Sequence, residues 1–95
     1  SDFTEKVLKA SNPVTVLFSS ETCPSCQTLK PKIKKLAEQK DGQTDFYEMD
    51  ITQTETWKKY NVMSIPTVLL FRNGKPQTRF DAMIRIDELE IALSN

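Results

Sequence analysis

The spacing of hydrophobic positions changes several times along the chain, and each change predicts a new element of secondary structure. Residues 3–10 place their apolar side chains near the helical period of about 3.6, and Asn12 and Pro13 end that segment. Residues 14–19, VTVLFS, are almost wholly apolar and mostly β-branched or aromatic, which predicts a strand buried on both faces, as in a parallel sheet. The helical period returns over residues 24–40, which predicts a longer helix.

The rest of the chain continues this change between extended and helical spacing. It predicts, in order, a strand at 45–51, a helix at 53–60, a strand at 65–71, a strand at 75–82 and a helix from Asp87 whose apolar side is Leu89, Ile91, Ala92 and Leu93. Asp41 and Gly42 end the long helix, and Pro66 stands at the start of its strand, where its missing N–H does least harm. Asn73-Gly74 is a strong hairpin signal, so the strands on either side of it should pair.

The order helix-strand-helix-strand-helix-strand-strand-helix narrows the fold class. A strand, a crossover helix and a second strand imply a parallel pair with a right-handed connection. The hairpin adds an antiparallel pair. We therefore predict a single α/β domain over residues 1–95, with a central mixed four-stranded sheet flanked by about four helices.

Composition and charge exclude several functions. The 13 basic and 13 acidic residues cancel, and the lysines over residues 30–35 are explained as a solvated helix face, so we expect no nucleic-acid partner. The chain has no histidine, which removes the commonest base and metal ligand. No apolar run approaches the ~20 residues of a membrane span, and no secretory signal is visible. We expect a cytoplasmic monomer that does not enter the membrane.

The only two cysteines lie three positions apart at the predicted start of the long helix. Pro24 occupies the first turn, where proline is favoured, and Cys26 begins an apolar stripe that continues with Leu29. Residues three apart share a helix face, so the two side chains can come close enough for a disulfide. A thiolate at Cys23 would be stabilised by the Ser25 and Cys26 amides and by the helix dipole. The pattern predicts a reactive thiol at the rim and a buried partner behind it.

This asymmetry assigns a role to each thiol. Cys23 would attack a substrate disulfide as the nucleophile, and Cys26 would then attack Cys23 and release the substrate. Three other interpretations stay open. A zinc site needs about four ligands, a structural disulfide closing so short a loop stabilises little, and the two thiols could simply be inert. The dithiol–disulfide cycle is favoured over these, and it needs neither a metal nor a dissociable cofactor.

The sequence around these cysteines resembles the thioredoxin family. The resemblance covers nearly all of residues 3–94 and rests on VTVLFSSETCPSC, on Pro31 inside the helix, on YNVMSIPTVLLFRNG, and on the closing strand and helix. It implies a thioredoxin-like fold. It also implies a cis bond between Ile65 and Pro66, although only about 5–6% of such bonds are cis in folded proteins.

The same resemblance implies how a substrate would be held. Pro66 would face the cysteines and shape a groove, and the Ile65 backbone could pair with an extended substrate segment, as a strand adds to a sheet edge. Thr22, directly before the first cysteine, and Pro24, directly after it, are further candidates for contact with the substrate. Met63 is another candidate, although it could simply belong to the core.

The chain departs from the family pattern at positions that matter for its chemistry. The tryptophan that the family places beside the first cysteine is Thr22 here, and its buried aspartate aligns with Leu17. The lysine partner of that aspartate aligns roughly with Glu48, and the glycine at the rim of the groove aligns with Ala82. The family's extra N-terminal strand is expected to be absent or very short.

Glu48 is a candidate replacement for the missing acid, acting as a proton relay for the buried cysteine. Leu17 cannot carry a proton, so some other group would have to do so. The alternative, which we favour from the sequence, is a surface carboxylate beside Lys58 or Lys59.

By this resemblance we expect a thiol-disulfide oxidoreductase that reduces protein disulfides and receives electrons from a donor of the thioredoxin-reductase type. The Pro24-Ser25 pair does not fix the reduction potential, so an extracytoplasmic exchange protein recharged by a membrane partner is one alternative. A non-catalytic binding module with the same fold is another, because the acid is missing at Leu17.

Overall fold

A computed structural model describes residues 3–39, 44–81 and 85–94 of the chain. The elements follow one another as η1 (Thr4–Leu8), β1 (Val14–Ser19), α1 (Pro24–Gln39), β2 (Asp45–Asp50), α2 (Thr56–Lys59), β3 (Thr67–Arg72), β4 (Lys75–Phe80) and α3 (Ile86–Ser94). This is the predicted order of elements. The predicted helix end at Asp41 and Gly42, and the rim position Ala82, lie outside the described residues.

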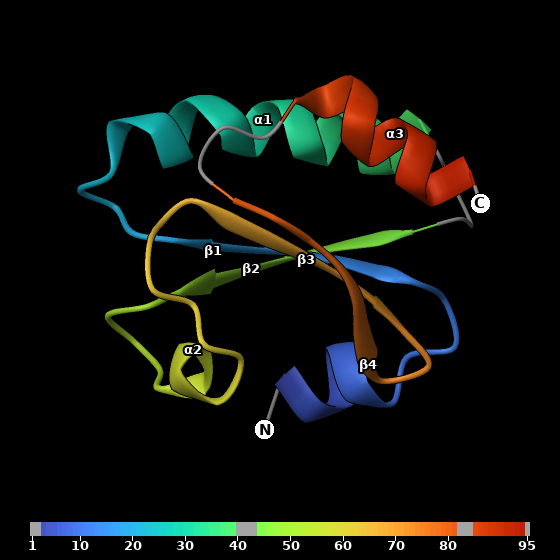
Figure 1. Cartoon of the computed structure of the whole chain (residues 1–95), viewed down its shortest axis with the longest axis horizontal. Coiled ribbons are helices and arrows are strands. Elements are labelled where there is room, and N and C mark those ends of the chain that lie inside the picture. Colours follow the sequence, from blue (N-terminus) through green and yellow to red (C-terminus); the bar gives the residue numbers. More distant parts are fainter. Residues whose placement is uncertain (1–2, 40–43, 82–84, 95) are drawn as a thin grey trace.

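The four strands form one mixed sheet in the order β2-β1-β3-β4. Strand β1 pairs in parallel with β2 and antiparallel with β3, and β3 pairs antiparallel with β4. All six residues of β1 are buried, as a central strand covered on both faces requires. The predicted α/β fold with a mixed four-stranded sheet is confirmed (Figure 1). Within the part of the chain that the structure describes, no fifth strand precedes β1.

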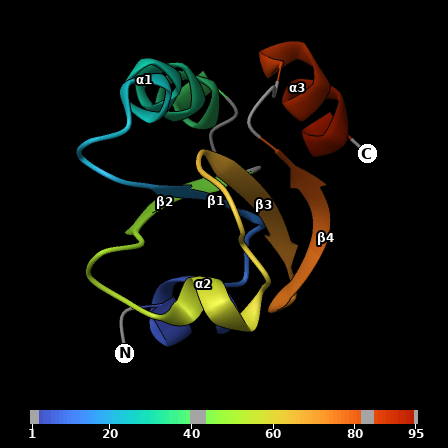
Figure 2. The same cartoon turned by 60° about the vertical axis from the view of Figure 1, so that its left-hand side comes forward.

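Helices cover both faces of the sheet. Figures 1 and 2 show α1 and α3 on one face and η1 and α2 on the other. Side chains of β1 and β3 point alternately to the two faces of the sheet and belong to two separate apolar clusters. The buried members on the α1 side are Leu17, Leu29, Ile33, Leu36, Val68, Leu70, Leu89 and Leu93. Those on the η1 side are Phe3, Val7, Val14, Val16, Phe18, Met49, Val62, Leu69 and Phe71.

The Asn73-Gly74 turn between β3 and β4 confirms the predicted hairpin. Both residues have positive φ, 54° and 78°, the backbone that a tight two-residue hairpin needs. A side chain at Gly74 would also meet η1, because a Cβ there would lie 2.7 Å from the carbonyl oxygen of Leu8. Glycine at this position therefore serves both the turn and the close packing of η1 against it.

Three predicted details are wrong. The third strand begins at Thr67, after the proline that was expected to open it. Helix α2 covers only Thr56–Lys59 instead of 53–60, because the backbone N–H groups of Thr52 and Thr56 bond to side-chain oxygens of residues two positions earlier. Ile91 does not belong to the apolar side of α3: it is 63% exposed, since the buried residues are Leu89 and Leu93, one helical turn apart.

Candidate active site

The cysteines lie at the end of the sheet where β1 and β2 finish and β3 begins. The N–H of Ile51, just after β2, donates to the carbonyl of Ser19 at the end of β1 over 2.9 Å. Thr67, the first residue of β3, pairs with Phe18. Three loops are therefore held together at this end of the sheet: those that leave β1 and β2 and the one that enters β3 (Figure 1).

The segment between β1 and α1 is fixed by a group of local hydrogen bonds around Ser20. The Ser20 carbonyl accepts the N–H of Cys23 and the Nε2 of Gln27, both over 3.1 Å. The Ser20 hydroxyl accepts the N–H of Thr22 over 3.2 Å. Sequence reasoning missed both Ser20 and Gln27 as positioning groups. The polar residues directly before a helix start were the available signal for Ser20.

Cys23 occupies the capping position of α1, as predicted. Its carbonyl accepts the N–H of Gln27 over 3.1 Å, which is the first bond of the helix. Its Sγ accepts the N–H of Cys26 over 3.2 Å and lies 3.5 Å from the Ser25 hydroxyl. Sulfur therefore takes the place of the usual capping oxygen, facing the positive end of the helix dipole. Ser25 thus contacts the Cys23 sulfur through its hydroxyl and not through the backbone amide that was predicted.

Cys23 and Cys26 form a disulfide, with their Cα atoms 5.2 Å apart. Cys26 is fully buried, at 0% exposure, and continues the buried stripe of α1, whereas Cys23 is only partly buried. The predicted asymmetry between a rim cysteine and an internal cysteine is present. A substrate approaching from solvent can reach the first sulfur and not the second.

The bond between Ile65 and Pro66 is cis, as the resemblance implied. Pro66 is buried directly before β3, and the Thr67 hydroxyl donates to the Ser64 carbonyl over 2.7 Å, which closes the turn ahead of it. Among the described residues, none hydrogen-bonds to the backbone of Ile65. Within the described part of the chain, the hydrogen-bonding groups of the Ile65 backbone thus have no partner.

The other predicted contact residues are accessible. Thr22 and Pro24 are exposed on the cysteine side. Met63 is 84% exposed, which rules out the core role considered for it. A mostly apolar hollow of about 260 Å³ lies beside it, lined by Ile51, Trp57, Val62, Met63, Ser64 and Ile65. Its volume falls below the ~300–1,000 Å³ typical of small-molecule sites and suits a single side chain.

Glu48 faces α1, which overturns the favoured expectation that it would lie beside Lys58 or Lys59. Its carboxylate accepts the Ser19 hydroxyl over 2.8 Å and pairs with Lys30 over 2.7 Å. Register explains the difference, because Glu48 lies opposite Leu17, whose side chain belongs to the α1 side. Lys58 instead pairs with Glu55 over 2.8 Å, and this hydrogen bond and charge lower the pKa of Glu55.

A polar hollow of about 230 Å³ adjoins Glu48, lined by Ser19, Glu21, Gln27, Lys30, Glu48 and Asp50. Here two hydrogen bonds from Thr52 hold the pKa of Asp50 below its ordinary value of 3.8. The bond from the Thr52 hydroxyl has the larger effect and the bond from the Thr52 N–H the smaller one. Within the described residues, no group of three or more His, Cys, Asp or Glu side chains is placed to hold a metal ion. None of the helices in this part of the chain is long and apolar enough to span a membrane.

Comparisons with known proteins point to one family. A model of the Thioredoxin family matches residues 1–95. The chain is 31% identical over 90 residues to "Probable thioredoxin-2" of Caenorhabditis elegans, covering 94% of this chain and 62% of that protein. It is 39% identical over 74 residues to "Thioredoxin" of Rickettsia bellii, covering 77% of this chain and 70% of that protein.

A third relative shows the same difference in length. "Thioredoxin, mitochondrial" of Mus musculus is 31% identical over 93 residues, covering 97% of this chain and 56% of that protein. The chain thus spans about three-fifths of the two animal relatives. With the capped cysteine pair, the cis proline and the mixed sheet, the match over the whole chain shows that this protein belongs to the thioredoxin family.

Proposed function

We propose that the protein is a thiol-disulfide oxidoreductase that reduces disulfides in other proteins. The observation that carries the proposal is the asymmetry of the cysteine pair at the start of α1. Cys23 is partly exposed and accepts the Cys26 N–H over 3.2 Å, while Cys26 is fully buried behind it. An amide aimed at an accessible sulfur favours its thiolate form, which is the reactive one.

The reaction is a transfer of two electrons in two exchanges. The Cys23 thiolate attacks one sulfur of the substrate disulfide and forms a mixed disulfide with it. The other substrate sulfur leaves as a thiolate and takes a proton. The Cys26 thiolate then attacks the Cys23 sulfur, which forms the Cys23–Cys26 disulfide and releases the second substrate sulfur. The substrate is reduced to a dithiol and the protein ends in the oxidised state.

The substrate is an extended polypeptide segment that lies across the end of the sheet. Support comes from the Ile65 backbone, which has no hydrogen-bond partner among the described residues and can add the segment as an extra strand. Pro66 fixes the turn below it, and Thr22 and Pro24 contact the segment on the cysteine side. Met63 and the apolar hollow beside it receive a side chain of the substrate.

Glu48 relays the proton that Cys26 must lose before it attacks. In support, Glu48 is partly buried, lies on the α1 side of the sheet and is connected through Ser19 to the end of β1. Lys30 holds its carboxylate in place. This assigns to β2 the role that the family gives to an acid at the position of Leu17.

The cycle closes when a donor reduces the disulfide again. We assign this role to a flavin-linked dithiol reductase of the thioredoxin-reductase type, in a reducing compartment such as the cytoplasm, where the dithiol form would persist. The protein itself carries no cofactor in this scheme, because both electrons reside on its two sulfur atoms.

Dithiothreitol-coupled reduction of insulin disulfides tests the proposal. We expect the parent to accelerate the reaction and Cys23→Ser to match the uncatalysed rate. Cys26→Ala should retain the attack and accumulate a mixed disulfide that mass spectrometry detects. Equal rates for the parent and Cys23→Ser would refute the proposal and favour a binding module. Equilibration with glutathione separates a reductase, near −270 mV, from an oxidant, near about −120 mV.

A further inference from the structure

The connection from α2 to β3 brings Met63 and Ile65 to the candidate active site, and its start is sharply defined. Helix α2 ends at Lys59 with Tyr60 as its C-cap residue, and Asn61 follows in the left-handed region with φ 54°. The N–H of Asn61 donates to the Lys58 carbonyl over 3.2 Å, and the N–H of Val62 donates to the Trp57 carbonyl over 2.9 Å. These two bonds are those of a Schellman cap. They leave the carbonyls of Tyr60 and Asn61 for other donors.

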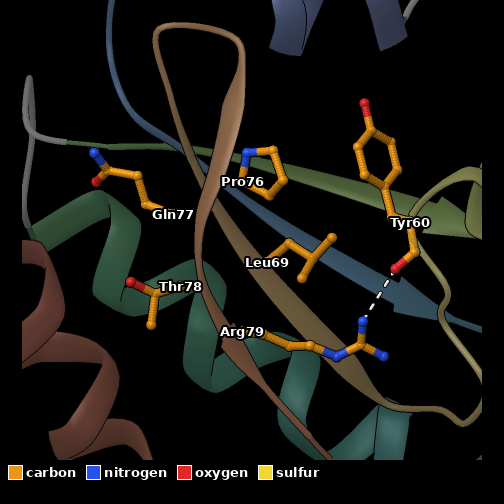
Figure 3. A pocket seen from close by; sticks show the side chains of 6 residues that line it. All are labelled: Tyr60, Leu69, Pro76, Gln77, Thr78 and Arg79. Carbon is orange, nitrogen blue, oxygen red and sulfur yellow. Dashed lines mark hydrogen bonds between the residues drawn. The ribbon is translucent and has the colours of Figure 1, made fainter.

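Arg79 of β4 supplies those donors across the fold. Its Nη1 donates to the Tyr60 carbonyl over 3.0 Å (Figure 3). Its Nη2 donates to the Asn61 carbonyl over 2.8 Å. Its Nε donates to the Asp81 carboxylate over 3.2 Å, which fixes the plane of the guanidinium. A rigid fork that holds two adjacent carbonyls sets both the position and the orientation of the backbone.

Side-chain packing holds one side of this part of the connection, where the Tyr60 ring contacts Phe3 and Phe71, but not the side that faces β4. A hollow of about 230 Å³ lies between the end of α2 and β4, lined by Tyr60, Leu69, Pro76, Gln77, Thr78 and Arg79. Figure 3 shows the Arg79 side chain reaching from β4 to the backbone of Tyr60 at the side of this hollow. Because a hollow replaces side-chain contacts there, the polar bonds of Arg79 hold the backbone on this side.

We propose that Arg79 is a positioning residue for protein substrates, an inference that rests on the proposed function. Its guanidinium holds the first residues of the connection. Met63 and Ile65, two and four residues beyond Asn61, are thereby kept at a fixed place at the end of the sheet where β1 leads to the cysteines and β3 begins. The cysteines themselves are fixed by α1 and Ser20, independently of Arg79. Loss of Arg79 therefore weakens recognition of a polypeptide and leaves the sulfur chemistry intact.

Arg72 provides a matched control. It too is an arginine on a strand whose Nη2 donates to a backbone carbonyl of a helix, that of Ala92 in α3, over 3.3 Å. It lies at the far end of β3, next to the hairpin turn. A loss of general rigidity should affect both arginine variants, whereas a loss of substrate positioning should affect only Arg79.

The test compares how fast each reduced protein is oxidised by insulin and by hydroxyethyl disulfide, a small substrate that needs no groove. We expect Arg79→Met to react about tenfold more slowly with insulin, equivalent to about 1.4 kcal/mol of lost interaction, and within about twofold of the parent with the small disulfide. Arg72→Met should match the parent in both reactions. Equal slowing of both reactions by Arg79→Met, or slowing of neither, would overturn the inference.

Arg79→Lys keeps the charge but cannot hold two carbonyls in one plane. It should fall between the parent and Arg79→Met with insulin, at about threefold slower than the parent, or about 0.6 kcal/mol. If Arg79→Met does not fold, as circular dichroism would show, the lysine variant decides alone, and a parent-like rate with insulin overturns the inference. Failure of the parent to exceed Cys23→Ser with insulin would instead refute the proposed function itself.

Discussion

The two faces of the sheet are built in different ways. On one face, α1 spans 16 residues and α3 spans 9, and both bury leucine side chains in a single apolar cluster. On the other face, η1 has five residues and α2 has four, and α2 contains no buried residue. This second face is completed by aromatic contacts of Phe3 with Tyr60 and Phe71, and by local hydrogen bonds.

The same difference separates the cysteines from the residues proposed to contact the substrate. The cysteines stand on the long helix α1, whose buried stripe fixes them to the sheet. The residues proposed to contact the substrate stand on the connection after α2, which polar bonds anchor at its two ends. Reacting atoms need positions held within about 0.5 Å, which a packed helix provides. A surface that binds different polypeptides can be built from loops and short helices that bury fewer side chains.

Matched leucine truncations give the largest test of this comparison. Leu89→Ala removes a fully buried side chain from α3 and should lower the free energy of unfolding by about 3 kcal/mol. Leu8→Ala removes a half-buried one from η1 and should cost only about 1 kcal/mol. Urea unfolding followed by Trp57 fluorescence measures both. Equal losses would show that the two faces are packed equally well, and the comparison would fail.

The parts of the molecule that could be predicted from the sequence are those in which neighbouring residues settle the outcome. The run VTVLFS marks a strand covered on both faces, and β1 has the predicted bounds. Asn73-Gly74 encodes its own turn through two positive φ angles. The cysteine pair could be placed because a helix start and a spacing of three are local properties. The cis bond at Pro66 came from family resemblance and not from residue propensities.

The contacts of Glu48 and Arg79, which the sequence did not predict, depend on residues far apart in the chain. Glu48 meets Lys30 because β1 and β2 pair in one particular register, which no local pattern reveals. Arg79 lies in a polar strand, and its partners Tyr60 and Asn61 are 19 and 18 positions away. Ile91 shows the opposite problem, since an apolar residue in an amphipathic segment can still face solvent.

Among the described residues, two large apolar side chains are exposed, Met63 after α2 and Ile91 on α3, and they give the next test. Met63→Gln should reduce insulin disulfides about fivefold more slowly, because an apolar contact with the substrate is lost, while stability stays within about 0.5 kcal/mol of the parent. Ile91→Gln, on α3, should change neither property. Insulin reduction and urea unfolding measure the pair. If both variants retain the parent's rate, the connection after α2 does not bind the substrate.

Glu48 lies on the α1 face and should give a smaller effect. Glu48→Gln keeps an acceptor for Ser19 but cannot carry a proton, so we expect release of the mixed disulfide to slow about threefold near neutral pH. Glu55→Gln is the control, because Glu55 also pairs with a lysine but lies on the α2 side. Rate against pH is measured for insulin reduction. Superimposable profiles for the parent and Glu48→Gln would exclude the relay.

The smallest effect concerns the turn between β2 and α2, which local hydrogen bonds of Asp50 and Thr52 help to hold. The Thr52 hydroxyl, and then the Thr52 N–H, lower the pKa of Asp50 below 3.8. A carboxyl whose pKa is lowered on folding stabilises the protein above its unfolded value, and this contribution is lost as the pH falls through the folded value. Thr52→Ala should therefore raise the pKa of Asp50 toward 3.8 and destabilise the protein slightly at neutral pH.

The difference between Thr52→Ala and the parent should begin to close as the pH falls below about 4, and it should vanish once the pH is below the lowered pKa of Asp50 in the parent, where Asp50 is protonated in both. Thr28→Ala is the control: its hydroxyl donates to the Pro24 carbonyl over 3.2 Å, so its loss involves no titrating group and should cost the same at every pH. Carboxyl NMR titration and urea unfolding at two pH values measure both variants. A pH-independent loss for Thr52→Ala would mean that the turn is held by its backbone shape, and that the α2 face needs no polar anchor at this end.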